Sequence, residues 1–215
     1  MVIKAIIFDM DGVILNSMPM HIKIWEYIFK RRELAFTLEL FQEFNGRNSK
    51  DIAEEMIQRY DLQEKAEDIL SEKMELERKY WDEMLALFPD ADGTLISLRD
   101  KGYKLALGTS ALPHMTEHVF NKFKLEKYFD AVVSAKDVEH TKPAPDIFLL
   151  AAKKLDTIPE ECAVVEDAVM GVEAANKAGM ISIGITTTFR AEAFIDADKV
   201  IKRLKDLLVE DFFGE

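Results

Sequence analysis

The stretch MVIKAIIFDMDG (residues 1–12) decides how the rest of the chain is interpreted. Its apolar part, residues 2–8, is rich in isoleucine, is too short for a helix and ends at a turn signal, Asp11-Gly12. It is also far shorter than a membrane span and lacks the features of a secretory signal. The stretch therefore predicts a buried β-strand with two aspartates, Asp9 and Asp11, directly after it.

The sequence that follows the first strand has a different texture. Between residues 17 and 88 glycine occurs only at Gly46, and long charged side chains alternate with apolar ones at helical spacing. This block predicts an all-helical domain without strands. We expect its helices over residues 19–31, 37–44, 49–60 and 63–86.

Residues 89–93 indicate a linker, and beyond it strands and helices alternate. Alternation of this kind favours a parallel sheet with helices on both faces. We therefore predict an α/β fold: a doubly wound (Rossmann-like) parallel sheet built from residues 1–16 and 89–215, with the helical domain 17–88 inserted after its first strand. The further strands are expected over residues 103–107, 131–134, 163–165 and 181–185 and near residue 200, with helices over 95–101, 115–123, 146–155 and 169–178 and from about 204.

Composition restricts the class of partner. The 215 residues include 40 acidic and 28 basic side chains, for a formal net charge of −12. A chain this acidic has no general electrostatic attraction to nucleic acid or to an anionic membrane. Its single cysteine, Cys162, cannot form an internal disulfide, which fits a reducing compartment. We expect a cytoplasmic protein that binds neither nucleic acid nor membrane.

Polar side chains follow several of the predicted strands. Ligands of open parallel sheets bind at the carboxyl ends of the strands, so these residues are expected to lie close together. Each alone could be a turn, a helix cap or a solvated charge, but four carboxylates at one edge would repel one another unless a cation neutralised them. Oxygen ligands favour a hard ion such as Mg²⁺. The candidate site consists of Asp9, Asp11, Thr109, Ser110, Lys142, Glu166 and Asp167.

Rival motifs are weaker. Residues 9–12 begin like a calcium-binding loop, but Ile14 and Met20 stand where that loop needs Gly and Glu. Residues 179–184 have the glycine spacing of a P-loop, but the required lysine is absent. Residues 114–118, HMTEH, fit a short zinc-peptidase pattern with no third ligand in evidence. A zinc peptidase and a catalytically silent binding protein remain remote alternatives.

With these residues in place, the sequence resembles the haloacid dehalogenase superfamily of phosphatases and phosphomutases, most closely its beta-phosphoglucomutase and sugar-phosphatase branch. The resemblance spans the whole chain and implies Mg²⁺-dependent phosphoryl transfer through an aspartyl phosphate. It is carried by four signatures in order: Asp9-Met10-Asp11-Gly12-Val13, Thr109-Ser110, Lys142-Pro143-Ala144-Pro145-Asp146, and Val165-Glu166-Asp167 with Gly171 following.

The resemblance also implies roles. Asp9 would be the nucleophile, and Asp11 would be the general acid that protonates the leaving oxygen and then the base that activates water. Mg²⁺ would be held by Asp9, the backbone carbonyl of Asp11 and Asp167, with Glu166 as an outer or alternate ligand. The phosphate would be held by Thr109, by backbone amides near Ser110, and by Lys142.

The resemblance implies that the helical domain is a cap that closes over the site, with hinges near residues 16–17 and 88–93. His21 matches a family histidine that assists proton transfer and cap closure, although a half-buried helix histidine is the alternative. Arg47 and Lys50 are candidates for contact with substrate, or ordinary surface charges. Lys73 and Lys79 are weaker candidates of the same kind.

Three departures bear on the choice between phosphatase and phosphomutase. Ser49 stands where the mutase pattern has an arginine, Asn16 where the family has Asp, and Ala168 where it has Ser. We therefore favour a phosphomonoester hydrolase acting on small phosphorylated metabolites, such as sugar phosphates or phosphoglycolate. The resemblance also implies a monomer, because many capped members of the family are monomers. A beta-phosphoglucomutase-type phosphomutase is the alternative.

Overall fold

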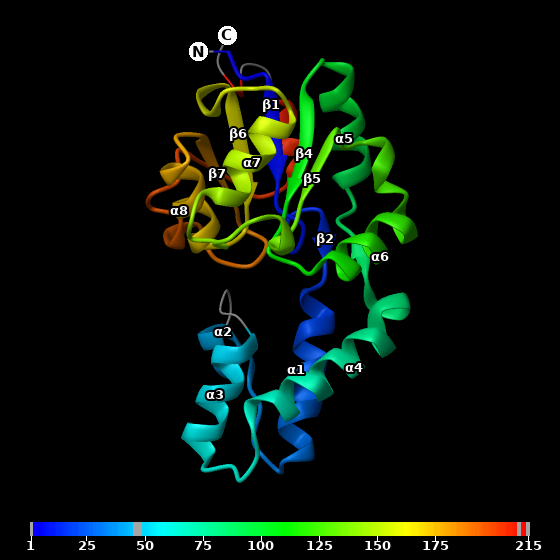
Figure 1. The fold of residues 1–215 in the computed structure, drawn as a ribbon, viewed down its shortest axis with the longest axis vertical. Helices are drawn as coiled ribbons and strands as arrows, with labels where there is room; N and C mark the ends of the chain where they lie inside the picture. Colours follow the sequence, from blue (N-terminus) through cyan, green and yellow to red (C-terminus); the bar gives the residue numbers. More distant parts are fainter. Residues whose placement is uncertain (1, 45–48, 210–211, 214–215) are drawn as a thin grey trace. The chain divides into compact units, whose positions relative to one another are not determined.

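The computed structural model describes residues 2–44, 49–209 and 212–213 of the chain (Figure 1). The chain forms two compact units. The first comprises Met1–Asn16 with Leu87–Glu215 and is called the sheet unit below; the second, Ser17–Ala86, is called the helical unit.

The sheet unit is built on six strands that are all parallel. Their order across the sheet is β5-β4-β1-β6-β7-β8, so the chain winds outward from β1 first on one side and then on the other. The predicted doubly wound α/β fold is confirmed. The strands are β1 (Ala5–Phe8), β4 (Lys104–Gly108), β5 (Ala131–Val133), β6 (Cys162–Glu166), β7 (Ile181–Ile185) and β8 (Lys199–Ile201).

Strand β1 lies at the centre of the sheet, and its register fixes the geometry of the sheet edge. Phe8, its last residue, is level with Leu107 of β4 and Val165 of β6. All four residues of β1 are buried, as expected of a strand covered on both faces. The residues that directly follow β1, β4 and β6 therefore leave the sheet within one residue of the same level.

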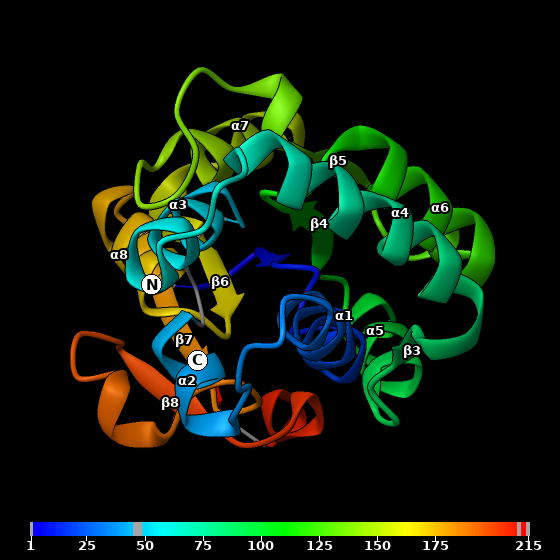
Figure 2. The ribbon, with the colours of Figure 1, turned by 90° about the horizontal axis from the view of Figure 1, so that it is seen from below.

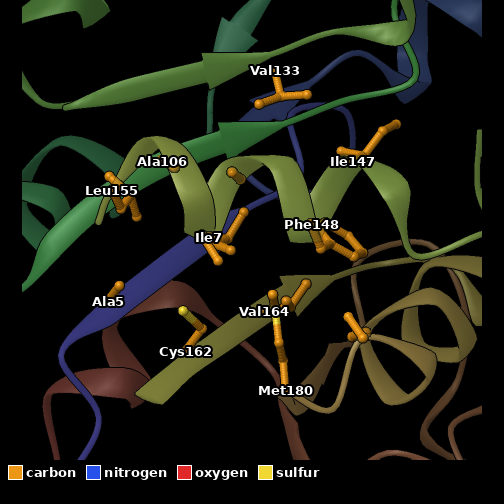
Figure 3. Close-up of a cluster of buried hydrophobic side chains, with 14 of the residues drawn as sticks. Ala5, Ile7, Ala106, Val133, Ile147, Phe148, Leu155, Cys162, Val164 and Met180 are labelled. Atoms are coloured by element: carbon orange, nitrogen blue, oxygen red, sulfur yellow. The ribbon is translucent and has the colours of Figure 1, made fainter. Parts of the chain in front are cut away.

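Helices cover both faces of the sheet. Figure 2 shows α7 (Asp146–Lys154) and α8 (Val169–Lys177) on one side of the strands, with α5 (Ala91–Asp100) on the other. Ile147 and Phe148 of α7 pack over Ile7 and Val164 in the cluster of Figure 3. The other elements of this unit are α6 (Pro113–Phe123) and short 3-10 helices at Leu125–Lys127, Ala135–Asp137, Pro159–Glu161, Ala191–Ala193 and Leu204–Leu208.

The helical unit contains helices within three residues of the predicted ranges. They are α1 (Met18–Arg31), α2 (Leu38–Phe44), α3 (Ser49–Tyr60) and α4 (Ala66–Met84). Helices α1 and α4 pack together, and Ile24, Ile28 and Ile69 are fully buried. A two-residue strand on each side of the unit, β2 (Leu15–Asn16) and β3 (Ala86–Leu87), pairs into a small sheet. Strand β3 lies within the block 17–88, so the expectation that this block has no strand was wrong at its C-terminal end.

The expected linker over residues 89–93 was also wrong, because α5 already begins at Ala91. Ala91, Leu95 and Leu98 are fully buried, so burial of this helix face begins at its first residue. Gly93 has open space around its α-carbon. A single glycine costs a helix only about 1 kcal/mol relative to alanine, and burial of the neighbouring face outweighs that cost.

Candidate active site

The candidate site begins at the carboxyl ends of β1, β4 and β6. The backbone N–H of Asp9 donates to the carbonyl oxygen of Val165 at 3.0 Å, and that of Thr109 to Val133 at 2.9 Å. Sheet hydrogen bonding thus continues one residue beyond the strands and holds these two residues at the edge. Asp9, Thr109 and Asp167 are all buried.

Lys142 joins three of the strand ends. Its Nζ donates to Asp9 Oδ1 at 2.5 Å, to Glu166 Oε1 at 2.7 Å and to the carbonyl oxygen of Gly108 at 3.0 Å. The side chain is 7% exposed, so these bonds form away from bulk water. The loop that carries Lys142 follows β5, and the structure therefore brings together the residues that the sequence placed on four separate strand ends.

The carboxylates outnumber the ammonium group that pairs with them. Burial raises the pKa of Asp9 to about 7; Lys142 opposes this rise, whereas Glu166 and Asp11 add to it. Burial, and then the charges of Glu166 and Asp9, raise the pKa of Asp167 well above its ordinary range. Burial acts to lower the pKa of Lys142, but Asp9 and Glu166 raise it overall. The cluster therefore carries excess negative charge that a cation would neutralise.

The donor set fits a hard cation that is only partly enclosed by protein. Among the described residues no three His, Cys, Asp or Glu side chains form a group that could hold a metal ion by themselves. Mg²⁺ ordinarily takes one or two carboxylates and completes its shell with waters and substrate phosphate. Asp9 and Asp167 are such a pair, because Asp9 is close enough to Asp167 for its charge to raise the pKa of Asp167.

Glu166 is held by the protein on both of its oxygens. Oε1 accepts from Lys142, and Oε2 accepts from the backbone N–H of Ala168 at 2.7 Å. A Cβ at Gly171 would lie 1.9 Å from Glu166 Oε1, so the glycine of the fourth signature makes room for this side chain. Because both of its oxygens are held by the protein, Glu166 is better suited to orienting the cluster than to binding a metal directly.

The turn that carries Asp11 packs directly on Asp167. Gly12 has φ +75°, and a Cβ there would lie 1.8 Å from Asp167 Oδ2, so only glycine allows this approach. The turn is closed by hydrogen bonds from Gly12 N–H to the Leu15 carbonyl and from Leu15 N–H to the Met10 carbonyl, both 2.8 Å. Asp11 is thereby held at the same sheet edge and remains half-buried.

Thr109 and Ser110 differ in accessibility. Thr109 is buried, and its Oγ1 accepts the backbone N–H of Ala111 at 3.1 Å. That bond uses the hydroxyl as an acceptor and leaves its proton to be donated. Ser110 is exposed, so Thr109 is the hydroxyl that the sheet edge itself fixes.

Two site residues were missed by the sequence analysis. Thr188 Oγ1 donates to Asp167 Oδ2, and Thr187 Oγ1 donates to the carbonyl oxygen of Gly12 at 2.5 Å. Both follow β7, a predicted strand whose end was not among the candidate positions. Their place after a strand end is the signal that could have made them candidates, whereas their hydrogen-bond partners are known only from the structure.

The predicted contacts in the helical unit have their own partners there. His21 Nδ1 lies 3.9 Å from Glu77 Oε1, and Glu77 is ion-paired with the buried Lys73. Burial, with a further effect of the Lys73 charge, lowers the pKa of His21 to about 4. Lys50 is exposed and lies 3.7 Å from Glu54. Arg47 lies outside the described residues.

The structure does not support the short zinc-peptidase pattern, which lies on α6. His114 and Glu117 are exposed, His118 is half-buried, and no third protein ligand accompanies them within the described part of the chain.

A family model described as haloacid dehalogenase-like hydrolase matches residues 6–185. The chain belongs to the haloacid dehalogenase-like hydrolase family. The family resemblance inferred from the four signatures is confirmed, and with it the expectation of an enzyme. No helix among the described residues is long and apolar enough to span a membrane.

Relatives of known name include two sugar-phosphate enzymes. The fructose-1-phosphate phosphatase YqaB of Escherichia coli is 33% identical over 84% of this chain and 95% of its own. The beta-phosphoglucomutase of Bacillus subtilis is 30% identical over 96% of this chain and 92% of its own. A haloacid dehalogenase hydrolase of family IA from Entamoeba histolytica has a similar structure, with a TM-score of 0.85, 25% identity and 97% of each chain covered.

Proposed function

We propose that this protein is a Mg²⁺-dependent phosphomonoester hydrolase that acts on small phosphorylated carbohydrates through an aspartyl phosphate on Asp9. The observation that carries the proposal is the position of Asp9: it lies at the central strand end, bonded to Lys142 and beside Asp11 and Asp167. Glu166, the other carboxylate bonded to Lys142, has its second oxygen held by the backbone N–H of Ala168, whereas Asp9 is bonded to Lys142 through one oxygen.

Asp9 is suited to nucleophilic attack. Lys142 holds Oδ1, so the carboxylate is fixed in orientation while its second oxygen can attack phosphorus. A bond forms between that oxygen and phosphorus as the bond from phosphorus to the leaving oxygen breaks. The bound Mg²⁺, held by Asp9, Asp167 and the backbone carbonyl of Asp11, would supply positive charge that reduces repulsion between the carboxylate and the phosphate.

Asp11 completes both half-reactions. Protonated, it gives its proton to the leaving alkoxide; ionised, it takes a proton from the water that attacks the aspartyl phosphate, which releases phosphate and restores Asp9. The closed turn at Gly12 keeps this side chain at the sheet edge. Thr109 donates its free hydroxyl proton to a phosphoryl oxygen, with backbone amides near Ser110 assisting, and Lys142 balances the charge of the phosphate.

The substrate class rests on the relatives. The named enzymes quoted above act on a sugar phosphate or bear the name of a sugar-phosphate mutase.

The helical unit would serve as the cap, with His21 and Lys50 as the described candidates for substrate contact. The similarity to beta-phosphoglucomutase keeps phosphomutase as the second candidate, whereas Ser49, in place of the arginine of the mutase pattern, favours hydrolysis. Monomeric state and cytoplasmic location stay predictions.

Phosphate release from a panel of sugar phosphates, phosphoglycolate and an aryl phosphate tests the proposal. Each substrate is assayed with Mg²⁺, with a chelator, and with Asp9→Asn. Asp100→Asn, a change of the same kind at an exposed position on α5, is the matched control. We expect turnover that requires Mg²⁺ and Asp9 but not Asp100.

If no panel member is hydrolysed, hydrolysis is wrong. The mutase is then tested by conversion of beta-glucose 1-phosphate to glucose 6-phosphate with a bisphosphate primer. Failure of that conversion as well would leave a catalytically silent fold.

A further inference from the structure

The loop that follows β7 reaches the site at two points. Thr187 Oγ1 donates to the carbonyl oxygen of Gly12 at 2.5 Å, which ties the loop to the turn that carries Asp11. The next residue, Thr188, donates its hydroxyl proton to Asp167 Oδ2. Two consecutive side-chain hydroxyls thus fasten a fifth strand end to the catalytic edge, through contacts that join residues far apart in the sequence.

The Thr188 bond distinguishes the two oxygens of Asp167. Oδ2 accepts from Thr188 and also packs against Gly12, where a Cβ would lie 1.8 Å from it and 3.0 Å from Thr188 Oγ1. Oδ1 makes neither contact. An Asp167 carboxylate held in this way cannot rotate freely, and it presents one chosen oxygen to a ligand. The residue after it, Ala168, has no hydroxyl that could do the same.

Asp167 is buried beside Glu166 and Asp9. A hydrogen bond donated to one oxygen of a buried carboxylate fixes the orientation in which the other oxygen meets a metal ion. Outer groups that hydrogen-bond to a metal-binding carboxylate typically change metal affinity by about 10- to 100-fold when they are removed.

We propose that Thr188 is a positioning residue that holds Asp167 correctly oriented for Mg²⁺, and that Thr187 anchors the loop from which it acts. The inference rests on the proposed function, because it assumes that Asp167 binds the metal. It adds a determinant of metal affinity outside the four signatures. It also predicts a particular kind of defect when the hydroxyl is lost: a weaker metal site in a protein that folds normally.

The test compares three variants with the wild type. Thr188→Val removes the hydroxyl and keeps the shape of the side chain, and Thr188→Ser keeps the hydroxyl. Thr186→Val is the matched control, since it makes the same change two residues earlier, at a side chain with no hydrogen bond to the carboxylates in the described part of the chain. Mg²⁺ affinity is measured by calorimetry and by the rise in Tm on adding Mg²⁺, neither of which depends on turnover.

We expect Thr188→Val to weaken Mg²⁺ binding by about 10- to 100-fold, while Thr188→Ser and Thr186→Val bind like the wild type. With chelator present, Thr188→Val should have a Tm close to that of Thr186→Val. In turnover assays it should need more Mg²⁺ for half-maximal rate, and its kcat at saturating Mg²⁺ should approach that of the wild type. A purely structural role would not shift the Mg²⁺ requirement while sparing kcat.

Two results would overturn the inference while leaving the proposed function standing. One is equal Mg²⁺ affinity in Thr188→Val and Thr186→Val; the other is an equal loss in Thr188→Ser, which would show that the hydroxyl is not the determinant. If Thr188→Val does not fold, Thr188→Ala answers the same question. A wild-type protein that binds no Mg²⁺ would instead refute the proposed function, and this inference with it.

Discussion

Replacing Lys142 by methionine tests the electrostatics of the site in depth. The change keeps an unbranched apolar side chain beside the Phe148 ring, which Nζ approaches to 4.9 Å, and removes only the charge and its donors. Three hydrogen bonds are lost, to Asp9, Glu166 and Gly108. Removing one partner of a buried ion pair typically costs about 3–5 kcal/mol of folding free energy, because the other charge is left buried and uncompensated.

The sign of the pH dependence follows from Asp9. Its pKa in the folded metal-free protein is about 7, and without Lys142 it must rise further, because Lys142 lowers it. Below pH 7 Asp9 is protonated in both proteins. Above pH 7 the folded variant retains a proton that the folded wild type has lost. The difference in unfolding free energy between the wild type and Lys142→Met therefore increases by about 1.4 kcal/mol per pH unit. We expect a loss of about 3–5 kcal/mol at pH 8.5 and about 2 kcal/mol less at pH 6.

Urea unfolding with chelator, followed by circular dichroism, measures this difference. Both tryptophans, Trp25 and Trp81, lie in the helical unit, so their fluorescence would report on the wrong part of the chain. Lys136→Met is the matched control, because this lysine is exposed. The reasoning is refuted if Lys142→Met costs less than about 1 kcal/mol at pH 8.5 or if its cost is the same at both pH values.

Three further predictions concern single residues. Gly12→Ala and Gly102→Ala both place alanine at positive φ (+75° and +88°), which should cost about 1–2 kcal/mol in urea unfolding. Gly12→Ala should cost about 1–3 kcal/mol more and lose Mg²⁺ affinity by calorimetry, because its Cβ would strike Asp167; equal costs and affinities would contradict the clash. The pKa of His21 is about 4 when folded, so below pH 6.5 the unfolded chain binds the extra proton, and the contribution of His21 to stability should fall by up to about 3 kcal/mol between pH 6.5 and 4. His21→Gln should remove that part of the pH dependence, and an unchanged profile would exclude His21 as its source. Asp11→Asn should lower kcat/KM for an alkyl phosphate by about 10²–10⁴-fold and for an aryl phosphate, whose leaving group needs less protonation, by less; equal losses would count against Asp11 as the acid.

The sheet and most of the candidate site could be predicted from the sequence for one physical reason. A parallel sheet covered on both faces needs strands that are continuous apolar runs, and such runs end sharply where polar side chains begin. Asp9, Thr109 and Asp167 follow runs of this kind directly, so strand ends could be located without coordinates. Lys142 was placed in the loop after β5, but its three acceptors could be known only from the structure.

What the sequence could not supply were contacts made by common residue types. Thr187 and Thr188 are ordinary hydroxyl side chains in a row of three threonines, and nothing in their pattern indicates Asp167 or Gly12 as partners. The ion pair of Lys73 with Glu77 is likewise one of many possible i, i+4 pairs on a charged helix. The helix start at Ala91 was not predicted, because Pro89 and Gly93 are local turn signals and the burial of Ala91 depends on tertiary packing.

The most direct test of covalent catalysis at Asp9 is detection of the phosphorylated residue itself. The enzyme is mixed with Mg²⁺ and its preferred sugar phosphate, quenched in acid within one turnover, digested and examined by mass spectrometry. We predict one added phosphoryl group on the peptide that contains Asp9 and none in Asp9→Asn. In Asp11→Asn given an aryl phosphate, whose leaving group needs less protonation, we predict more of this group, because water attack is slowed. Turnover by Asp9→Asn, or turnover by the wild type with no phosphoryl group on Asp9 in either the wild type or Asp11→Asn, would contradict the mechanism.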